Sequence, residues 1–260
     1  MCFRNRSRVW RMTLSDYKTV LVTGASAGIG AAVVRDLTSR GLTVHAFARR
    51  AERLNDLAAE TGCTPHQLDV RDTSAMTELF DEIGADVLVN NAGVGRAIDS
   101  TVTADPADLS QTIDTNVTAV LQATRAALPA MMAAGRGHII NIGSVAGLYP
   151  LSSAVYGASK GAIHFMSTNL RLELVGTGIR VTEICPGRVA TEFYDAAIDD
   201  EALRHQLKET GITEITSADV AASITYALDA PWYVNVARVE LQPLEQTYGG
   251  VNFDTAPQNQ

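Results

Sequence analysis

The stretch YGASK, residues 156–160, places a tyrosine four positions ahead of a lysine. On a helix these two side chains lie one turn apart on the same face, so the Lys160 ammonium can approach the Tyr156 phenol. A phenol ordinarily has a pKa of about 10, and lowering it by roughly 3 units takes about 4 kcal/mol of preference for the phenolate. A neighbouring lysine supplies part of that preference. The pair can therefore exchange a proton with a substrate oxygen, and the alternative interpretation is a solvated helix face.

A second chemical signal is the glycine-rich stretch TGASAGIG at residues 23–30, which follows the β-branched run TVLVT and precedes a helical pattern. Small residues at such a junction let the backbone approach a pyrophosphate, and the N–H groups at the helix start favour its negative charge. The spacing G-x-x-x-G-x-G differs from the commoner G-x-G-x-x-G, and a tight turn without a ligand is the alternative. We predict a dinucleotide site with contacts from Gly24, Ser26, Ala27, Gly28, Ile29 and Gly30.

The end of the second predicted strand separates the two nicotinamide cofactors. An acidic side chain there would hydrogen-bond a ribose 2′-hydroxyl and repel a 2′-phosphate. The chain instead reads AFARR at 46–50, so Ala48 takes the acidic position and Arg49 and Arg50 follow. Two guanidinium groups can clamp a phosphate, with solvated loop arginines as the alternative. We therefore predict NADP as the cofactor in preference to NAD.

The elements that must position these residues alternate between strands and helices. The pattern predicts strands at 19–23, 43–48, 64–70, 86–90, 138–144, 179–187 and 237–242. It predicts helices at 31–41, 52–62, 73–83, 107–133 and 155–175. Repeated strand-helix-strand units build a parallel sheet. We therefore expect an α/β protein with a single-domain Rossmann fold, in which helices flank a doubly wound parallel sheet of about seven strands.

Length and composition exclude several classes of protein. The 260 residues contain no linker or repeat, and no apolar stretch approaches the roughly 20 residues of a membrane span. A net charge of −8 argues against a sequence-independent grip on nucleic acid. Three widely spaced cysteines and five histidines match neither a disulfide framework nor a metal-ligand pattern. We expect a soluble, cytoplasmic protein with reduced thiols, no metal, and no nucleic-acid or membrane partner.

The predicted boundaries leave a segment outside the fold at each end. We expect the fold to occupy residues 16–252, with 1–15 as a disordered N-terminal arm and 253–260 as a flexible tail. The arm contains four arginines but no apolar segment of the kind that a secretory signal needs. A basic arm can bind polyanions or belong to an organelle presequence, but we interpret this one as a tail without a structural role.

Several short motifs occur in one order along residues 19–191. They are TGASAGIG, NNAG at 90–93, Asn116, Ser144, YGASK and PGRVAT at 186–191. In this order they resemble the short-chain dehydrogenase/reductase family, which transfers hydride between a nicotinamide cofactor and a carbon that bears an oxygen. The resemblance implies a catalytic set of Asn116, Ser144, Tyr156 and Lys160. In that set Ser144 hydrogen-bonds the substrate oxygen, and Asn116 holds a water that links Lys160 to solvent.

The same resemblance assigns the remaining cofactor contacts. It implies that Asp69 and Val70 flank the adenine. The resemblance also implies that four residues line the nicotinamide carboxamide: Pro186, Gly187, Val189 and Thr191. The cofactor side of the sheet is supported by Asn90, Ala92 and Gly93. Family members associate through their long helices, which implies a homotetramer or homodimer with contacts at 107–133 and 155–175.

The substrate is suggested by a narrower resemblance. The stretches at 113–132, 137–147 and 235–252 resemble the branch of 3-hydroxy acid dehydrogenases that oxidise serine and allo-threonine. An acid could be bound by Arg188 or Arg96, although pairing of Arg188 with Glu192 or water is the alternative, and Tyr149 and Tyr194 could wall the pocket. The polar segment 193–215 is expected to form a mobile lid. An uncharged or sulfonated carbonyl substrate, an epimerase or dehydratase reaction, and a non-catalytic NADP sensor are the alternative functions.

Overall fold

The computed structural model describes residues 13–98, 100–150 and 153–247. Its centre is a seven-stranded sheet in the order β3-β2-β1-β4-β5-β6-β7, in which every neighbouring pair is parallel. The strands are β1 (Thr19–Thr23), β2 (Thr43–Ala48), β3 (Thr64–Gln67), β4 (Val87–Asn90), β5 (Gly137–Ile142), β6 (Ile179–Pro186) and β7 (Arg238–Leu241). The chain order reverses between β1 and β4, which is where doubly wound sheets bind dinucleotides. The predicted single-domain Rossmann architecture is confirmed.

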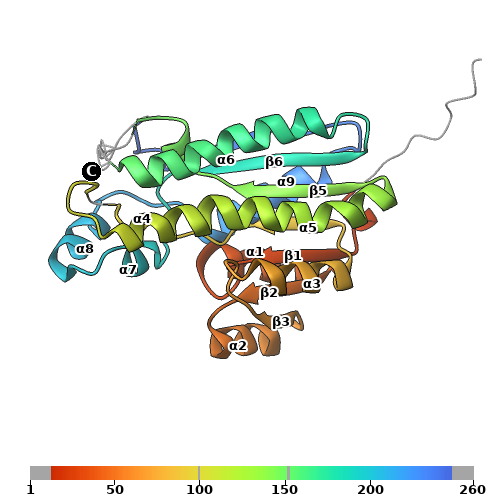
Figure 1. The fold of residues 1–260 in the computed structure, drawn as a ribbon, viewed down its shortest axis with the longest axis horizontal. Helices are drawn as coiled ribbons and strands as arrows, with labels where there is room; N and C mark the ends of the chain where they lie inside the picture. Colours follow the sequence, from red (N-terminus) through yellow and green to blue (C-terminus); the bar gives the residue numbers. More distant parts are fainter. Residues whose placement is uncertain (1–12, 99, 151–152, 248–260) are drawn as a thin grey trace, which may run out of the picture.

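Helices cover both faces of this sheet (Figure 1). One face packs against α1 (Gly28–Ser39), α2 (Ala51–Thr61) and α9 (Ser217–Asp229). The other packs against α3 (Thr73–Ile83), α5 (Ala119–Ala134) and α6 (Ala154–Glu173). Two apolar cores result, and β1 contributes to both because alternate side chains of a strand point to opposite faces: Val20 and Val22 enter one core and Leu21 the other.

Three short helices lie at the end of the sheet where the strands finish. Figure 1 shows α4 (Pro106–Ile113), α7 (Phe193–Ala197) and α8 (Glu201–Lys208) gathered beyond the carboxyl ends of the central strands. The segment predicted as a lid, 193–215, contains α7 and α8, which we call the α7–α8 lobe. Its mobility stays a prediction.

The observed elements differ from the predicted ones in instructive places. Helix α1 begins at Gly28, not at residue 31, because the glycine turn itself forms the first helical turn. Strand β3 ends at Gln67 because its neighbour β2 ends at Ala48, the residue that pairs with Gln67. The predicted helix 107–133 is continuous but contains a π-helical turn, η2 (Asp114–Thr118), between α4 and α5. The sequence interpretation missed α9 entirely.

Few residues of the predicted terminal segments are described. Of the arm predicted at 1–15, residues 13–15 are described, and Leu14 and Ser15 belong to a short 3₁₀ helix, η1 (Leu14–Asp16). The Leu14 backbone N–H donates to Asp229 Oδ1 at 3.0 Å, which ties this turn to the end of α9. The rest of the arm and the tail at 253–260 lie outside the described residues. Within the described ranges, no helix combines the length and apolar character that crossing a membrane requires.

A buried arginine closes the amino-terminal edge of the sheet. Arg180, on β6, is 5% exposed and donates to the carbonyl oxygens of Leu228 and Ala230, each at 2.8 Å, and of Val234 at 3.2 Å. It also donates to the hydroxyl of Tyr17 at 2.7 Å. The guanidinium thus neutralises the negative end of α9, whose last carbonyls have no helical partners. These bonds tie the last helix to β6 and to the segment before β1.

Candidate functional site

A cleft of about 430 Å³ opens at the carboxyl edge of the sheet, around the reversal point between β1 and β4. This volume and position are typical of small-molecule sites in doubly wound folds. The predicted site residues that line it include Gly24, Ser26, Ala27, Gly28, Ile29, Arg49, Arg50, Asp69, Val70, Ala92, Gly93, Ser144, Tyr149, Tyr156, Lys160, Pro186, Gly187, Arg188, Val189, Thr191 and Tyr194. The cleft therefore joins the predicted cofactor and catalytic residues in one place.

The glycine turn is built for close backbone contact. Gly24 has a φ of +66°, and a Cβ there would lie 2.8 Å from the Cα of Ala92. A Cβ on Gly30 would overlap the Gly24 carbonyl oxygen. Asn91 holds the turn against β4 by donating from Nδ2 to the carbonyl oxygens of Thr23, at 2.9 Å, and Gly24, at 3.1 Å. The resulting cradle at the start of α1 fits a pyrophosphate.

The end of β2 presents arginines and no carboxylate, as the sequence predicted. Arg50 donates from Nε to Ser26 Oγ of the glycine turn at 3.1 Å, and both Arg49 and Arg50 line the cleft. On the neighbouring loop Asp69 receives a two-pronged ion pair from Arg71, with Nη2 at 2.6 Å. This pairing lowers the pKa of Asp69 below its ordinary value and leaves the carboxylate neutralised beside the predicted adenine position.

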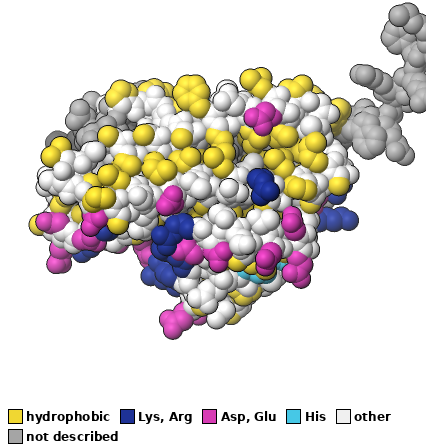
Figure 2. All heavy atoms as spheres, in the orientation of Figure 1, with side chains coloured by type: hydrophobic (Ala, Val, Ile, Leu, Met, Phe, Trp, Pro, Cys, Tyr) yellow, Lys and Arg dark blue, Asp and Glu magenta, His cyan; other side chains and the backbone are white. Residues whose placement is uncertain are grey.

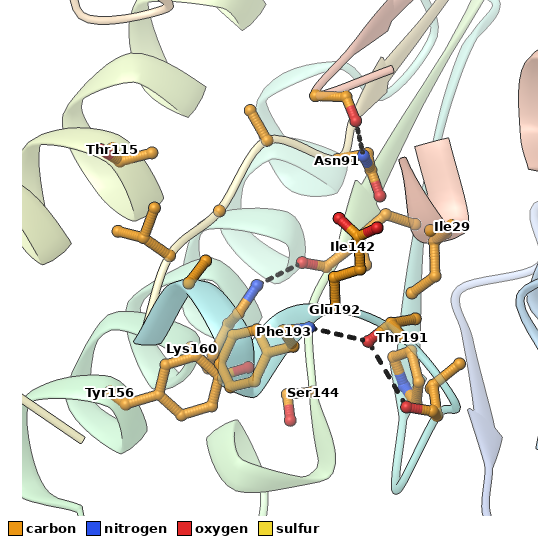
Figure 3. A pocket seen from close by; sticks show the side chains of 18 of the residues that line it. Ile29, Asn91, Thr115, Ile142, Ser144, Tyr156, Lys160, Thr191, Glu192 and Phe193 are labelled. Carbon is orange, nitrogen blue, oxygen red and sulfur yellow. Dashed lines mark hydrogen bonds between the residues drawn. The ribbon is translucent and has the colours of Figure 1, made fainter. Parts of the chain in front are cut away.

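Tyr156 lies in the first turn of α6 and lines the cleft (Figure 3). Burial raises the pKa of its phenol, and a hydrogen bond with Ser144 acts in the opposite direction. Ser144 follows β5 and its Oγ also accepts a hydrogen bond from the Ala146 backbone at 3.1 Å. The ring of Phe193 covers the phenol, with ring centroids 5.4 Å apart. The phenol and the serine hydroxyl thus share one water-poor position where a substrate oxygen can bind both.

Lys160 follows Tyr156 by one helical turn, as predicted, but its ammonium makes a different contact. Its Nζ donates to the carbonyl oxygen of Ile142 at 2.8 Å and lies 5.9 Å from the centroid of the Tyr156 ring (Figure 3). Burial lowers the pKa of Lys160 to about 8, while Cys185 and Glu183 on β6 act to raise it. Lys160 is not among the groups that shift the pKa of Tyr156 in the protein alone. The predicted lowering of the phenol pKa by Lys160 is therefore not seen in the protein alone, where burial raises that pKa and Lys160 does not contribute.

Asn116 occupies the π-helical turn η2, an irregularity that is frequent at functional sites. Its Oδ1 accepts from the Val94 backbone at 2.8 Å, and its Nδ2 donates to the Val94 carbonyl at 2.9 Å and to Ser159 Oγ at 3.0 Å. A Cβ on Gly93 would lie 3.4 Å from Asn116 Oδ1 and 3.7 Å from Lys160 Nζ, so the amide and the ammonium flank the same glycine. The relay through a water stays a prediction.

The predicted substrate residues have partners within the protein. Arg188 lines the cleft, where its Nε pairs with Glu214 at 2.5 Å, its Nη2 donates to the Leu207 carbonyl, and its guanidinium lies 4.3 Å from the centroid of the Tyr194 ring. The alternative pairing with Glu192 is wrong, since that carboxylate pairs elsewhere. Tyr149 donates to Glu240 at 2.9 Å. Both tyrosines line the cleft.

Arg96 does not belong to the lining of the cleft. It forms ion pairs with Asp108, at 2.9 Å, and with Asp199 of the α7–α8 lobe, at 2.6 Å. These two carboxylates raise its pKa above the ordinary value. Arg96 therefore ties the α7–α8 lobe to α4 and is not placed to contact a substrate in the cleft.

Asn90 likewise lies beneath the cleft and not in its lining. Its amide donates to Thr124, at 3.2 Å, and to Asn141, at 2.9 Å, inside the protein. Three other residues that matter were missed by the sequence interpretation: Phe193 over the phenol, and Glu192 and Arg53 at the mouth of the cleft. Only the position of Glu192 and Phe193 directly after Thr191 could have suggested that they approach the site.

Comparisons with known proteins agree with this geometry. The family described as short chain dehydrogenase matches residues 18–202. The NADP-dependent 3-hydroxy acid dehydrogenase YdfG of Escherichia coli (strain K12) is 38% identical, over 90% of this chain and 98% of its own. The sulfoacetaldehyde reductase 2 of Chromohalobacter salexigens is 37% identical, over 90% of this chain and 98% of its own.

A solved structure gives the same result. The closed form of serine dehydrogenase complexed with NADP+ superimposes with a TM-score of 0.85 at 38% identity, over 90% of this chain and 98% of that one. This chain belongs to the short-chain dehydrogenase family, as the order of its motifs predicted. It is an oxidoreductase of the kind that acts on the CH–OH group of a donor.

Proposed function

We propose that this protein transfers a hydride between NADP(H) and a small 3-hydroxy acid or its carbonyl counterpart. The observation that carries the proposal is the meeting of Ser144, Tyr156 and Lys160 in the cleft whose far end is lined by Arg49 and Arg50. An arginine pair without a carboxylate suits the 2′-phosphate of NADP. Named relatives are NADP-dependent or bind NADP+, which supports the same cofactor.

The chemistry requires a proton to move together with the hydride. A bound nicotinamide cofactor would supply the hydride acceptor, and oxidation of the carbinol carbon would then require the hydroxyl oxygen of the substrate to lose its proton. Tyr156 is placed to accept that proton, and Ser144 to hold the oxygen beside it. In reduction the phenol donates the proton instead. Lys160 and Asn116, on either side of Gly93, are placed to carry the proton onward.

The proposed acid recognition rests on Arg188, the cation in the described substrate end of the cleft. Its guanidinium already binds a carboxylate, that of Glu214, at 2.5 Å. A substrate carboxylate can compete with Glu214 for this guanidinium, so that the buried cation stays paired while the Glu214 carboxylate, 19% exposed, turns toward solvent. A sulfonate would suit the same guanidinium, and the sulfoacetaldehyde reductase of Chromohalobacter salexigens makes that substrate class the second candidate.

Kinetics of Arg188→Gln test this recognition, with Arg96→Gln as the matched control because Arg96 is paired in the same region but lies outside the cleft lining. We expect Arg188→Gln to raise KM for a 3-hydroxy acid about tenfold or more, as loss of a charge-assisted pair implies, and to leave an uncharged secondary alcohol unaffected. Arg96→Gln should affect both substrates alike. Equal effects of Arg188→Gln on acid and alcohol would exclude Arg188 as the acid-binding group.

Association into a homotetramer or homodimer is part of the proposal. Figure 2 shows hydrophobic side chains along the face formed by α5 and α6. Large exposed apolar residues on the helices of this face are Ile113, Leu121, Met132, Phe165 and Leu172. An apolar surface of this kind marks an interface. The mass in solution tests this expectation, and a cytoplasmic location stays a prediction from the sequence.

A further inference from the structure

Glu192 bridges the mouth of the cofactor cleft. It is the residue before α7, yet its Oε2 lies 2.6 Å from Arg53 Nη1 and 3.4 Å from Arg50 Nη1. Arg50 ends the loop after β2, and Arg53 lies in the first turn of α2. A carboxylate from one wall of the cleft is thus bound by two guanidinium groups from the other wall.

The bridge occupies Arg50, one of the two arginines predicted to bind the 2′-phosphate of NADP. Thr191, next to Glu192, packs on the glycine turn: a Cβ on Gly28 would lie 3.4 Å from Thr191 Cγ2. Glu192 itself lines the cleft (Figure 3). Arg49 and Arg50 belong to the same lining. Figure 2 shows basic side chains gathered in the hollow between the α7–α8 lobe and the end of the molecule formed by α2 and β3. In the protein alone, the carboxylate of Glu192 therefore partly neutralises the positive charge of Arg50 and Arg53.

The ion pairs of Glu192 with Arg50 and Arg53 should be weak, because all three side chains are exposed. The side chains of Arg50, Arg53 and Glu192 are 49%, 46% and 53% exposed. Exposed ion pairs contribute little because water screens them. A phosphate monoester carries about two negative charges and three acceptor oxygens, so it competes well against one carboxylate for the same arginines.

We propose that Glu192 is a placeholder for the 2′-phosphate of NADP(H), that Arg53 is a third arginine of the phosphate site, and that phosphate binding releases Glu192. This inference rests on the proposed cofactor. Its consequence is selective: NADP(H) must displace the carboxylate from Arg50 and Arg53, whereas NAD(H) has no group that takes its place. Because Glu192 adjoins α7, the exchange also couples cofactor binding to the α7–α8 lobe, whose Phe193 covers Tyr156.

Cofactor affinity without substrate tests the placeholder. The variants are Glu192→Gln and, as a matched control, Glu52→Gln, which removes a negative charge from the same first turn of α2 without a partner in the bridge. Dissociation constants for NADPH and NADH are measured by fluorescence titration at low and high salt. We expect Glu192→Gln to tighten NADPH about two- to fivefold, as loss of a competing exposed pair implies, and to leave NADH unchanged. High salt should reduce the gain.

The contribution of Arg53 to NADPH binding is measured in the Glu192→Gln variant, in which no carboxylate competes for Arg53. In Glu192→Gln, the further change Arg53→Gln should weaken NADPH and leave NADH unchanged. Equal changes for both cofactors in Glu192→Gln, or a gain of the same size in Glu52→Gln, would overturn the placeholder. Unchanged NADPH affinity in the double variant would overturn the third arginine. A wild-type protein that binds NADH as tightly as NADPH would instead contradict the proposed cofactor, and that result is visible before any variant is made.

Discussion

Each edge of the sheet contains a buried cation, Arg180 at the amino-terminal edge and Lys160 at the carboxyl edge. The two cations differ in how many hydrogen bonds they make. At the amino-terminal edge Arg180 donates four hydrogen bonds, three of them to backbone carbonyls and one to Tyr17. At the carboxyl edge Lys160 Nζ donates one hydrogen bond among the described residues, to the Ile142 carbonyl. Both terminal nitrogens of the Arg180 guanidinium have partners and only its buried Nε lacks one, whereas Lys160 retains donors that face a cleft.

This difference separates stability from chemistry. Burying a charge costs free energy unless partners replace the lost water. Arg180 has those partners, so the edge around it is closed and holds α9, β6 and the segment before β1 together. Lys160 lacks most of them, and its lowered pKa reports the cost. A group that is poorly satisfied in the protein alone is ready to bind and to move protons, whereas a satisfied one is not.

The largest expected effect is at the carboxyl edge. Tyr156→Phe removes the hydroxyl that we propose exchanges a proton with the substrate, and we expect turnover to fall about a thousandfold. The ring keeps its contact with Phe193, and Ser144 keeps its bond from the Ala146 backbone, so the melting temperature and the dissociation constant for NADPH should stay close to those of the wild type. Steady-state rates at 340 nm and a thermal melt check this. Turnover within tenfold of the wild type would show that Tyr156 is not the acid and base.

The next largest effect is at the amino-terminal edge. Arg180→Met leaves the last carbonyls of α9 and the Tyr17 hydroxyl without their donor, and we expect a loss of about 3 kcal/mol in the free energy of unfolding. Urea unfolding measures it. Arg136→Met is the control on the same edge, because Arg136 is 40% exposed and makes a 3.4 Å pair with Asp86. That control should lose less than about 1 kcal/mol. Equal losses in Arg180→Met and Arg136→Met would show that the buried hydrogen bonds of Arg180 stabilise the fold no more than an exposed ion pair does.

A smaller effect is the pH dependence that Lys160 imposes. Its pKa is about 8 in the folded protein against 10.5 ordinarily, because of burial. Between these values the unfolded chain holds a proton that the folded protein has released, so the stability of the folded protein rises with pH. From pH 7.5 to 9.5 the gain should be about 2 kcal/mol relative to Lys160→Met, measured without cofactor by urea unfolding. A parallel pH dependence in both proteins would contradict the lowered pKa.

The sequence predicted the carboxyl edge far better than the amino-terminal one. Tyr156, Lys160, Ser144 and the glycine turn could be found because local motifs specify them: i, i+4 spacing on a helix, and small residues between a strand and a helix. The parallel, doubly wound sheet followed from the same strand-helix alternation. Their mutual approach in one cleft is a direct consequence of the parallel sheet, whose carboxyl ends meet at one edge.

The contacts that sequence reasoning missed join distant segments. Arg180 donates to Leu228 of α9 and to Tyr17, which lie 48 and 163 positions away in the sequence. No local sequence pattern predicts such long-range pairs. Glu192 meets Arg53 across 139 positions. The effect of burial on Tyr156 also escaped prediction, because the Y-x-x-x-K spacing specifies proximity along a helix but not the direction in which the Lys160 ammonium turns.

The most direct test of the account is the initial rate of NADP+ reduction at 340 nm with a 3-hydroxy acid, measured for the wild type, Tyr156→Phe and Arg180→Met at equal concentrations of folded protein. The account predicts that folded Arg180→Met keeps the wild-type rate while Tyr156→Phe loses it. A rate that falls as much in folded Arg180→Met as in Tyr156→Phe, or that survives in Tyr156→Phe, would contradict the separation of a catalytic edge from a stabilising one.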